Sequence, residues 1–117
     1  MKPIIVSIVD SHAGARQKIA GQLKADEGFQ CVSQFDRAED ALEMLPLDRP
    51  DVVLMEIQLD GMDGIECVRC LKTRMPEVQV IMLTTHTDAE SIFAAFRAGA
   101  NGYLLKPQPP RKLMEAI

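Results

Sequence analysis

Residues 50–66 read PDVVLMEIQLDGMDGIE, and this stretch decides the fold. Four apolar residues follow one another at Val52–Met55 without polar alternation, which is typical of a strand buried on both faces. The acidic residue Glu56 comes next, and residues 58–64 hold two glycines and two aspartates, a composition that favours a loop. We therefore expect a central strand over 51–57 that carries Glu56 near its end.

The same unit, an apolar run followed by a helical segment, repeats on both sides of this stretch. Strands are expected over 3–9, 29–35, 51–57, 78–83 and 102–105. Helices are expected over 12–25, 37–45, 65–75 and 88–98, and a last helix is expected to open at Pro109 or Pro110. Gly28, Pro46 and Gly99 are expected to stop the first, second and fourth helices. Because parallel strands need crossover connections, this alternation predicts a doubly wound α/β fold, with helices on both faces of a parallel sheet.

The length of 117 residues is that of one domain, assigned to 1–117, and a second folded domain does not fit. A hydrophobic content of 47% with 26% charged residues is ordinary for a soluble globular protein. The apolar pattern of the last helix is still running at Ile117. We therefore expect this last helix to be truncated at the C-terminus.

The net charge of the chain indicates which classes of partner it can bind. A net charge of −4, with no Lys/Arg run longer than two residues, argues against direct binding to nucleic acid or to acidic membranes. The apolar stretch before Asp10 is too short for a signal peptide or a spanning helix. A cytoplasmic location is therefore expected.

The three cysteines are an odd number, which argues for free thiols in a reducing compartment. Cys67 and Cys70 form a C-x-x-C, but Cys31 lies far away in sequence, and His12 and His86 belong to other segments. A redox or metal role is the less favoured interpretation. We expect two helix-packing thiols one turn apart.

Polar residues follow the expected strands where each one ends. They are Asp10 and Ser11 after the first strand, Glu56 at the third, Thr84 at the fourth and Lys106 at the fifth. In doubly wound sheets the ligand crevice lies beyond the carboxyl ends of the strands. This set indicates a site for an anion or a divalent cation, and the alternative is a purely structural ion-pair cluster.

Four segments carry a resemblance to a known family: IIVSIVDSH (4–12) with Arg16 after it, PDVVLMEIQLDGMDGIE (50–66), VIMLTT (80–85) and AGANGYLLKP (98–107). In order and spacing they resemble the receiver domain of two-component response regulators, over essentially the whole chain. The placement of His12 and Arg16 is most similar to the subgroup that precedes a LuxR-type or NarL-type helix-turn-helix output domain. The resemblance implies a CheY-like, flavodoxin-like (βα)5 fold in three layers, strand order 2-1-3-4-5, and a signalling function without enzymatic activity.

In that family a histidine kinase phosphorylates an aspartate at the end of the third strand, and acidic residues after the first strand hold Mg²⁺. The resemblance places Glu56 at the phosphoacceptor position. It places Asp10 and Ser11 at the acidic pair, where the second member is usually a direct metal ligand, and the backbone carbonyl of Gln58 beside the metal. Two of the three acidic positions have therefore changed.

The resemblance also assigns the contacts to the phosphoryl group. Thr84 is where a hydroxyl contacts it, Lys106 is where an ammonium pairs with it, and Tyr103 is where an aromatic side chain switches rotamer, although plain packing explains Tyr103 equally well. Asp60 occupies a position where proline is usual, and Thr85 one where a small residue is usual. These two changes are expected to affect the rigidity of the loop and access to the site.

The substitutions have physical consequences. The extra methylene of Glu56 moves the carboxylate by about 1 Å, a misplacement that can cost ~10²-fold in phosphoryl transfer. Exchanging a carboxylate for the Ser11 hydroxyl should weaken Mg²⁺ binding strongly. We expect a phosphorylation-independent or phosphomimetic receiver, with Mg²⁺ weak or absent, in which Glu56 approaches Lys106 and Thr84.

Two alternatives remain. One is a phosphorylation-competent receiver that controls a DNA-binding transcriptional output domain and uses Glu56 or Asp10 as acceptor. The other is a small flavodoxin-like enzyme or nucleotide binder, but residues 10–14, DSHAG, lack a phosphate-cradling glycine loop.

The expected partners are a histidine kinase or another signalling protein, and a C-terminal helix-turn-helix domain. By resemblance, the face made by the fourth helix, fifth strand and fifth helix is where a homodimer would form. Phe93 and Phe96 could join that surface, although core packing is expected to account for at least one of them.

Overall fold

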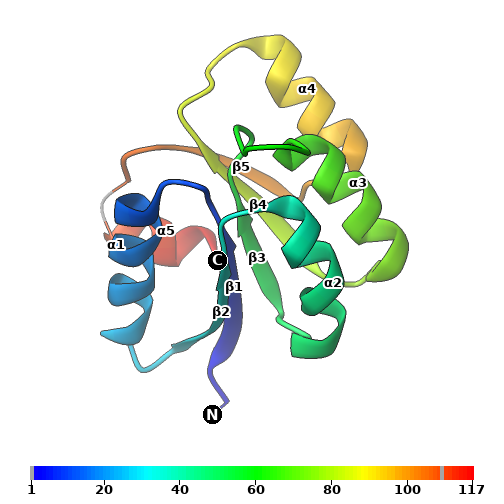
Figure 1. The fold of residues 1–117 in the computed structure, drawn as a ribbon. Coiled ribbons are helices and arrows are strands. Elements are labelled where there is room, and N and C mark those ends of the chain that lie inside the picture. Colours follow the sequence, from blue (N-terminus) through cyan, green and yellow to red (C-terminus); the bar gives the residue numbers. More distant parts are fainter. Residues whose placement is uncertain (1, 109) are drawn as a thin grey trace.

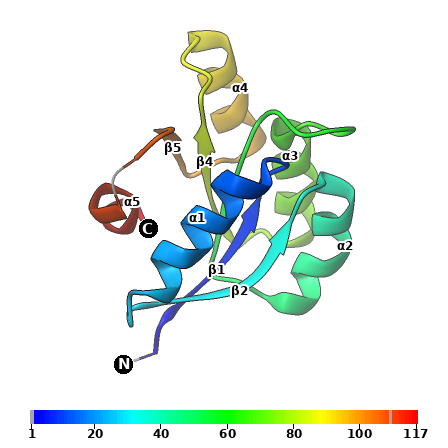
Figure 2. The same ribbon diagram turned by 60° about the vertical axis from the view of Figure 1, so that its left-hand side comes forward.

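The computed structural model describes residues 2–108 and 110–117 (Figure 1). The elements are β1 (Ile4–Val9), α1 (Ala13–Lys24), β2 (Phe29–Phe35), α2 (Ala38–Asp48), β3 (Val52–Met55), α3 (Gly64–Arg74), β4 (Gln79–Thr84), α4 (Ala89–Ala98), β5 (Gly102–Leu105) and α5 (Pro110–Ala116). The five strands form one parallel sheet in the order β2-β1-β3-β4-β5, with β2 and β5 at its edges (Figure 2). The expected doubly wound fold and strand order are confirmed.

The helices cover the sheet in two groups (Figure 1). One face packs under α1 and α5, and the other packs under α2, α3 and α4. Every residue of β3 is buried, with Val52 and Leu54 in the first core and Val53 and Met55 in the second. This explains why the central strand shows no polar alternation.

The expectation that Pro46 ends the second helix is wrong, because α2 continues through it to Asp48. Proline has no N–H, so the carbonyl of Leu42, four residues earlier, lacks its helical donor. Arg74 supplies one, with Nη1 2.9 Å from the Leu42 oxygen. The helix instead stops at Arg49, whose φ of 53° is left-handed and whose N–H bonds to Leu45.

Gly28 does not stop the first helix as expected. α1 ends at Lys24, and Gly28 lies in the turn before β2, where its N–H donates to Asp26 Oδ1. Gly99 does act as predicted: it ends α4 with a φ of 119°. The last helix begins at Pro110, while Pro109 lies outside the described residues.

Within the described part of the chain, no helix has the length and apolar character needed to span a membrane. The three cysteines, all of them described, are free thiols. Cys67 is buried in the core under α2 and α3. The expectation of a helix-packing thiol is confirmed for this residue.

Candidate functional site

The carboxyl ends of β1, β3 and β5 bring Asp10, Glu56 and Lys106 together. Each residue directly follows its strand, and its backbone N–H is bonded to the neighbouring strand: Asp10 to Phe35, Glu56 to Val9, and Lys106 to Thr84. These bonds extend the sheet by one residue and fix where the three side chains start. The sequence-based expectation that they gather at one edge is therefore confirmed.

A lysine lies between two carboxylates at this edge. Lys106 Nζ is 2.7 Å from Glu56 Oε2, and it also pairs with Asp10 Oδ2. Asp10 is 3% exposed, Glu56 is 7% exposed, and the Lys106 side chain is 16% exposed. The charges are thus largely removed from water. In such a buried position an unpaired carboxylate would be costly.

This environment keeps Lys106 charged. Burial by itself would lower the pKa of the Lys106 ammonium, but hydrogen bonds to Asp10 and Glu56 outweigh burial and raise the pKa above its usual value. The lysine is therefore a permanent cation at physiological pH.

The second carboxylate oxygen of Glu56 accepts hydrogen bonds from the backbone of the two residues that follow it. Oε1 accepts hydrogen bonds from the N–H of Ile57 at 2.8 Å and of Gln58 at 3.3 Å. Glu56 reaches Lys106, as expected. In the part of the chain that the structure describes, its carboxylate bonds to Ile57, Gln58 and Lys106, and the expected approach to Thr84 stays a prediction.

Asp10 is held by the turn that leads into α1. Its Oδ1 accepts from the N–H of His12 at 2.9 Å, and its main-chain oxygen accepts from Arg16 Nη1 at 2.7 Å. The His12 ring caps α1, with Nδ1 accepting from the N–H of Ala15. The helix was expected to begin at His12, but it begins at Ala13 and His12 is its N-cap. Sequence analysis missed the role of Arg16, which only its spacing after Asp10 could have suggested.

Ser11 faces the loop after β3. Its Oγ donates to the main-chain oxygen of Gln58 at 3.4 Å. The neutral hydroxyl thus binds the same carbonyl that the family resemblance placed beside a metal. Across residues 2–108 and 110–117, no three His, Cys, Asp or Glu side chains gather closely enough to hold a metal ion.

Gly64 sets the path of the loop beneath the site, and sequence analysis assigned it no role. A Cβ at this position would lie 1.9 Å from the main-chain oxygen of Glu56, so only glycine fits. The Gly64 N–H donates to the oxygen of Ile57 at 2.7 Å. This contact anchors the peptide whose N–H holds Glu56 Oε1.

Thr84 and Tyr103 form a second, separate network. Thr84 is fully buried, and its Oγ1 accepts from the N–H of His86 at 3.4 Å. Tyr103 Oη donates to the main-chain oxygen of His86 at 2.9 Å. Burial, and then the negative charges of Asp88 and Glu56, raise the pKa of Tyr103, so the phenol stays protonated and can donate. Both residues therefore hold the loop between β4 and α4.

Phe93 and Phe96 lie on the outer face of α4. Phe93 is 70% exposed and Phe96 is 45% exposed, so the expectation that the core accounts for one of them is wrong. The Phe96 ring instead packs against the Tyr103 ring, with the ring centroids 6.4 Å apart. Helical spacing shows that two residues share a face, but it does not show whether that face is inward.

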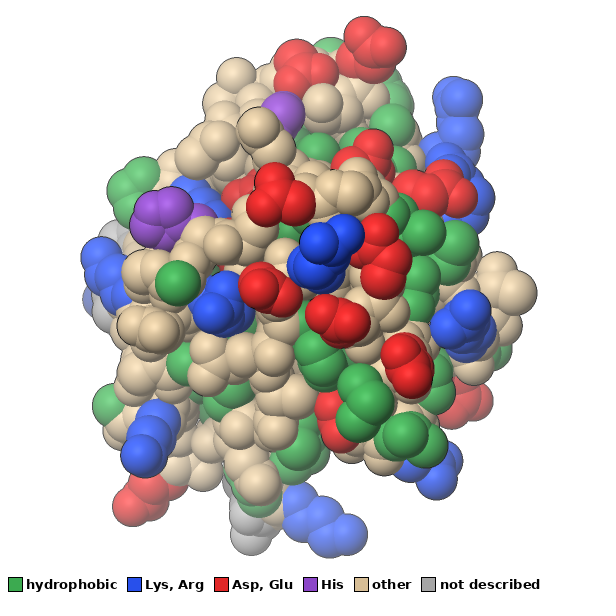
Figure 3. Space-filling model, viewed as in Figure 1, with side chains coloured by type: hydrophobic (Ala, Val, Ile, Leu, Met, Phe, Trp, Pro, Cys, Tyr) green, Lys and Arg blue, Asp and Glu red, His purple; other side chains and the backbone are tan. Residues whose placement is uncertain are grey.

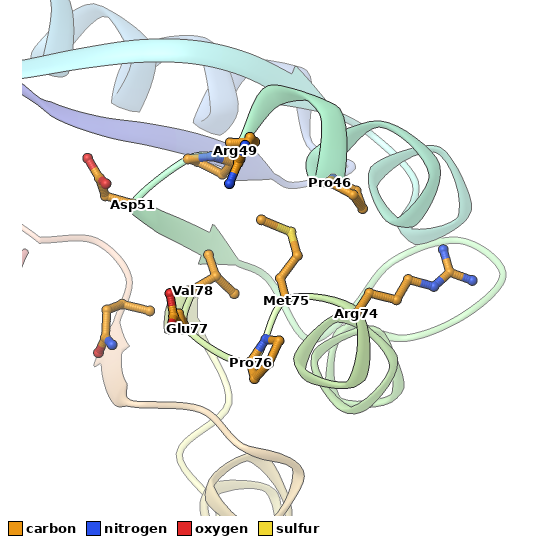
Figure 4. Close-up of a pocket in the computed structure, with 10 residues that line it drawn as sticks. Pro46, Arg49, Asp51, Arg74, Met75, Pro76, Glu77 and Val78 are labelled. Atoms are coloured by element: carbon orange, nitrogen blue, oxygen red, sulfur yellow. The ribbon is translucent and has the colours of Figure 1, made fainter.

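Two hollows differ in their chemistry. The site opens to solvent through a cleft of about 430 Å³ lined by Asp10, Ser11, Glu56 and Lys106 among others. A larger hollow of about 660 Å³ lies at the opposite end of the sheet, between Pro46 and Arg49 on one side and Arg74 to Val78 on the other (Figure 4). Its arginines and acids do not converge on one point, so we assign the functional site to the cleft.

Acidic side chains gather round the amino ends of α2 and α3, with basic side chains among them, on the side of the molecule shown in Figure 3. Glu39 and Asp40 lie in the first turn of α2, and Glu66 lies in the first turn of α3. The two ends meet where Glu39 Oε2 accepts from the N–H of Met62. Arg37 lies 3.8 Å from Glu39 and Arg69 pairs with Glu66, so bases balance part of this negative charge.

Comparison with known proteins gives a consistent result. The family model described as "Response regulator receiver domain" matches residues 6–117. The chain is 33% identical to the nitrate/nitrite response regulator protein NarP of Escherichia coli, over 98% of this chain and 54% of that protein. It is 33% identical to the DNA-binding transcriptional activator DevR/DosR of Mycobacterium tuberculosis, over 96% of this chain and 52% of that protein.

Solved structures give the same match. A two-component response regulator of the LuxR family from Aurantimonas sp. SI85-9A1 superposes with a TM-score of 0.92 and 27% identity, over 98% of this chain and 82% of that one. The chain spans about half the length of the curated relatives it matches.

Proposed function

Since this chain belongs to the response regulator receiver domain family, we propose that it is a member that works without phosphorylation. Receiver domains are regulatory signalling domains of two-component systems rather than enzymes. Relatives of the NarL and LuxR type include DNA-binding activators.

One observation carries the proposal: Lys106 bridges Asp10 and Glu56. In the family, the lysine at this position pairs with the phosphoryl group. Here the carboxylate of Glu56 lies 2.7 Å from the same ammonium without any phosphoryl group. A carboxylate offers one charge and two oxygens where a phosphoryl group offers nearly two charges and three oxygens, so the mimicry is partial.

The donors do not fit Mg²⁺. The ion needs near-octahedral oxygen ligands, usually including one or two free carboxylates. Asp10 and Glu56 are both engaged with Lys106, and the Gln58 carbonyl accepts from Ser11. A metal would have to displace the ammonium and then lack the acid that Ser11 replaces. We propose that Mg²⁺ binding is weak or absent.

The partners follow from the family and from the exposed apolar residues. We propose a histidine kinase or another signalling protein as the input, and a C-terminal helix-turn-helix domain as the output, with 1–117 as the receiver. Phe93, Phe96 and Leu105 are exposed on α4 and β5. They support a homodimer through the face formed by α4, β5 and α5.

A second candidate is a phosphorylation-competent receiver that controls a DNA-binding transcriptional output. The similarity to a DNA-binding activator over 96% of this chain favours it, as does the opening of the cleft beside Glu56. It requires Glu56 or Asp10 to leave Lys106 and attack phosphorus. The two candidates therefore differ in one chemical outcome.

The experiment is intact-mass measurement after incubation with a small-molecule phosphodonor and Mg²⁺. The proposal expects no phosphoryl adduct on the native protein. The Ser11→Asp/Glu56→Asp double variant restores both carboxylates and is expected to become labelled. A stoichiometric adduct on the native protein would favour the second candidate, and an unlabelled double variant would show that these two positions are not what changed the site.

A further inference from the structure

The groups that hold the Glu56 carboxylate make up a small anion site of their own. Two backbone N–H groups, of Ile57 and Gln58, point at Oε1, and the Lys106 ammonium lies 2.7 Å from Oε2. The peptide between Ile57 and Gln58, which carries the Gln58 N–H, is held by the bond from the Gly64 N–H to the Ile57 oxygen. Lys106 also pairs with Asp10, so one of its two carboxylate partners does not depend on the Glu56 side chain.

Removing the side chain would leave the two amides without this acceptor and Lys106 with one carboxylate fewer. The Ile57 N–H is buried, and Lys106 would keep only Asp10. An unpaired buried donor is costly, so an acceptor that restores the bonds is favoured. The cleft that Glu56 lines opens to solvent, which gives a small ion a route in.

We infer that Glu56 acts as an intramolecular ligand of this site, which takes a free monocarboxylate when the side chain is shortened. The inference rests on the proposed function, since both treat the carboxylate as a fixed partner of Lys106. Asp10 sits beside the same ammonium and would repel a second negative charge. The site therefore favours a planar, singly charged carboxylate over phosphate.

The test uses Glu56→Ala, which removes one methylene and the carboxylate, a volume that acetate matches. Acetate is expected to raise the urea midpoint of this variant in a saturable way, because a ligand that binds only the native state stabilises it. Four non-hydrogen atoms limit the dissociation constant to roughly tens of micromolar at best, so the titration runs well into the millimolar range. If the variant is unfolded alone, recovery of its circular dichroism on adding acetate reports the same binding.

Controls separate charge from volume. Acetamide, the neutral analogue, should give no shift, and inorganic phosphate at equal ionic strength should give a smaller shift than acetate. The wild-type protein and Glu56→Gln, whose side chains fill the space, should not respond. Lys106→Gln in the Glu56→Ala background should abolish the acetate response.

The inference is overturned if acetate leaves Glu56→Ala unchanged, if acetamide acts as well as acetate, or if phosphate acts more strongly. Each of these results leaves the proposed function standing, provided that the native protein stays unlabelled by a phosphodonor. A phosphoryl adduct on the native protein overturns the proposed function whatever acetate does to the variant.

Discussion

Arg74 Nη1, on α3, donates a 2.9 Å hydrogen bond to the main-chain oxygen of Leu42 on α2. That oxygen lies four residues before Pro46, which has no N–H to offer it. The guanidinium therefore replaces a helical donor and joins the two helices. It allows a proline inside α2 without a break in the helix.

Arg74→Ala is expected to destabilise the protein by about 1–2 kcal/mol, because it leaves the Leu42 oxygen unpaired. Pro46→Ala restores a helical N–H to that oxygen, so Arg74→Ala should cost less than about 0.5 kcal/mol in the Pro46→Ala background. Urea unfolding of the four proteins in this double-mutant cycle measures the difference. If Arg74→Ala lowers the unfolding free energy equally in both backgrounds, Arg74 does not replace the hydrogen-bond donor that Pro46 lacks.

The ion pair of Lys106 predicts a loss of stability at high pH. The folded-state pKa of Lys106 lies above its usual value of 10.5, so the pair contributes fully below that pH and is lost as pH rises through the folded pKa. Lys106→Gln leaves two carboxylates without their cation and should cost about 3 kcal/mol near neutral pH. The difference in unfolding free energy between wild type and variant should stay constant to about pH 10 and narrow above it. A difference that begins to fall near pH 7 would contradict the pairing.

Cys67 is predicted to be the slowest of the three thiols to react with an alkylating reagent. Burial, and then the nearby charges of Cys70 and Glu39, raise its pKa from 9.0 to about 12, so its thiolate is on the order of 10³-fold rarer than that of a free thiol. Alkylation at pH 8 followed by peptide mass mapping should show Cys67 protected in the native state and reactive in urea. Cβ atoms three residues apart on a helix lie about 5–6 Å apart, beyond the range for a disulfide, so mild oxidation should not join Cys67 to Cys70. Native labelling of Cys67 as fast as Cys70 would contradict its burial.

Gly64 and Gly21 offer a matched pair of glycine substitutions. Gly64→Ala places a methyl group 1.9 Å from the Glu56 oxygen and is expected to cost about 3 kcal/mol or more. Gly21→Ala, inside α1, meets no atom within 4 Å and should stabilise the protein by about 0.5–1 kcal/mol. Thermal or urea unfolding distinguishes them. Similar effects of the two changes would argue against the close approach of α3 to Glu56.

The strands and the main members of the site could be predicted from sequence because their signals are local. Apolar runs without alternation located β1 and β3, a short apolar segment located β5, and the residue after each strand had to lie at the same sheet edge. Asp10, Glu56 and Lys106 therefore met as expected. Topology alone brings them within reach.

What could not be predicted depends on contacts between side chains and distant backbone. No residue near Pro46 in the sequence indicates that Arg74 supplies a hydrogen-bond donor to the Leu42 oxygen. The predicted end of α2 was therefore too early. Thr84 shares the sheet edge with Glu56, yet its hydroxyl bonds to His86 instead. The direction of a side chain at a shared edge is decided by local hydrogen bonds that spacing does not encode.

The amides of Ile57 and Gln58 test the central claim most directly, because their N–H groups point at Glu56 Oε1. Proton–nitrogen spectra are recorded before and after adding a phosphodonor with excess Mg²⁺. A fixed pair of Glu56 with Lys106 predicts that both amide signals stay where they are. Movement of both signals together with a stoichiometric gain of one phosphoryl group would contradict it.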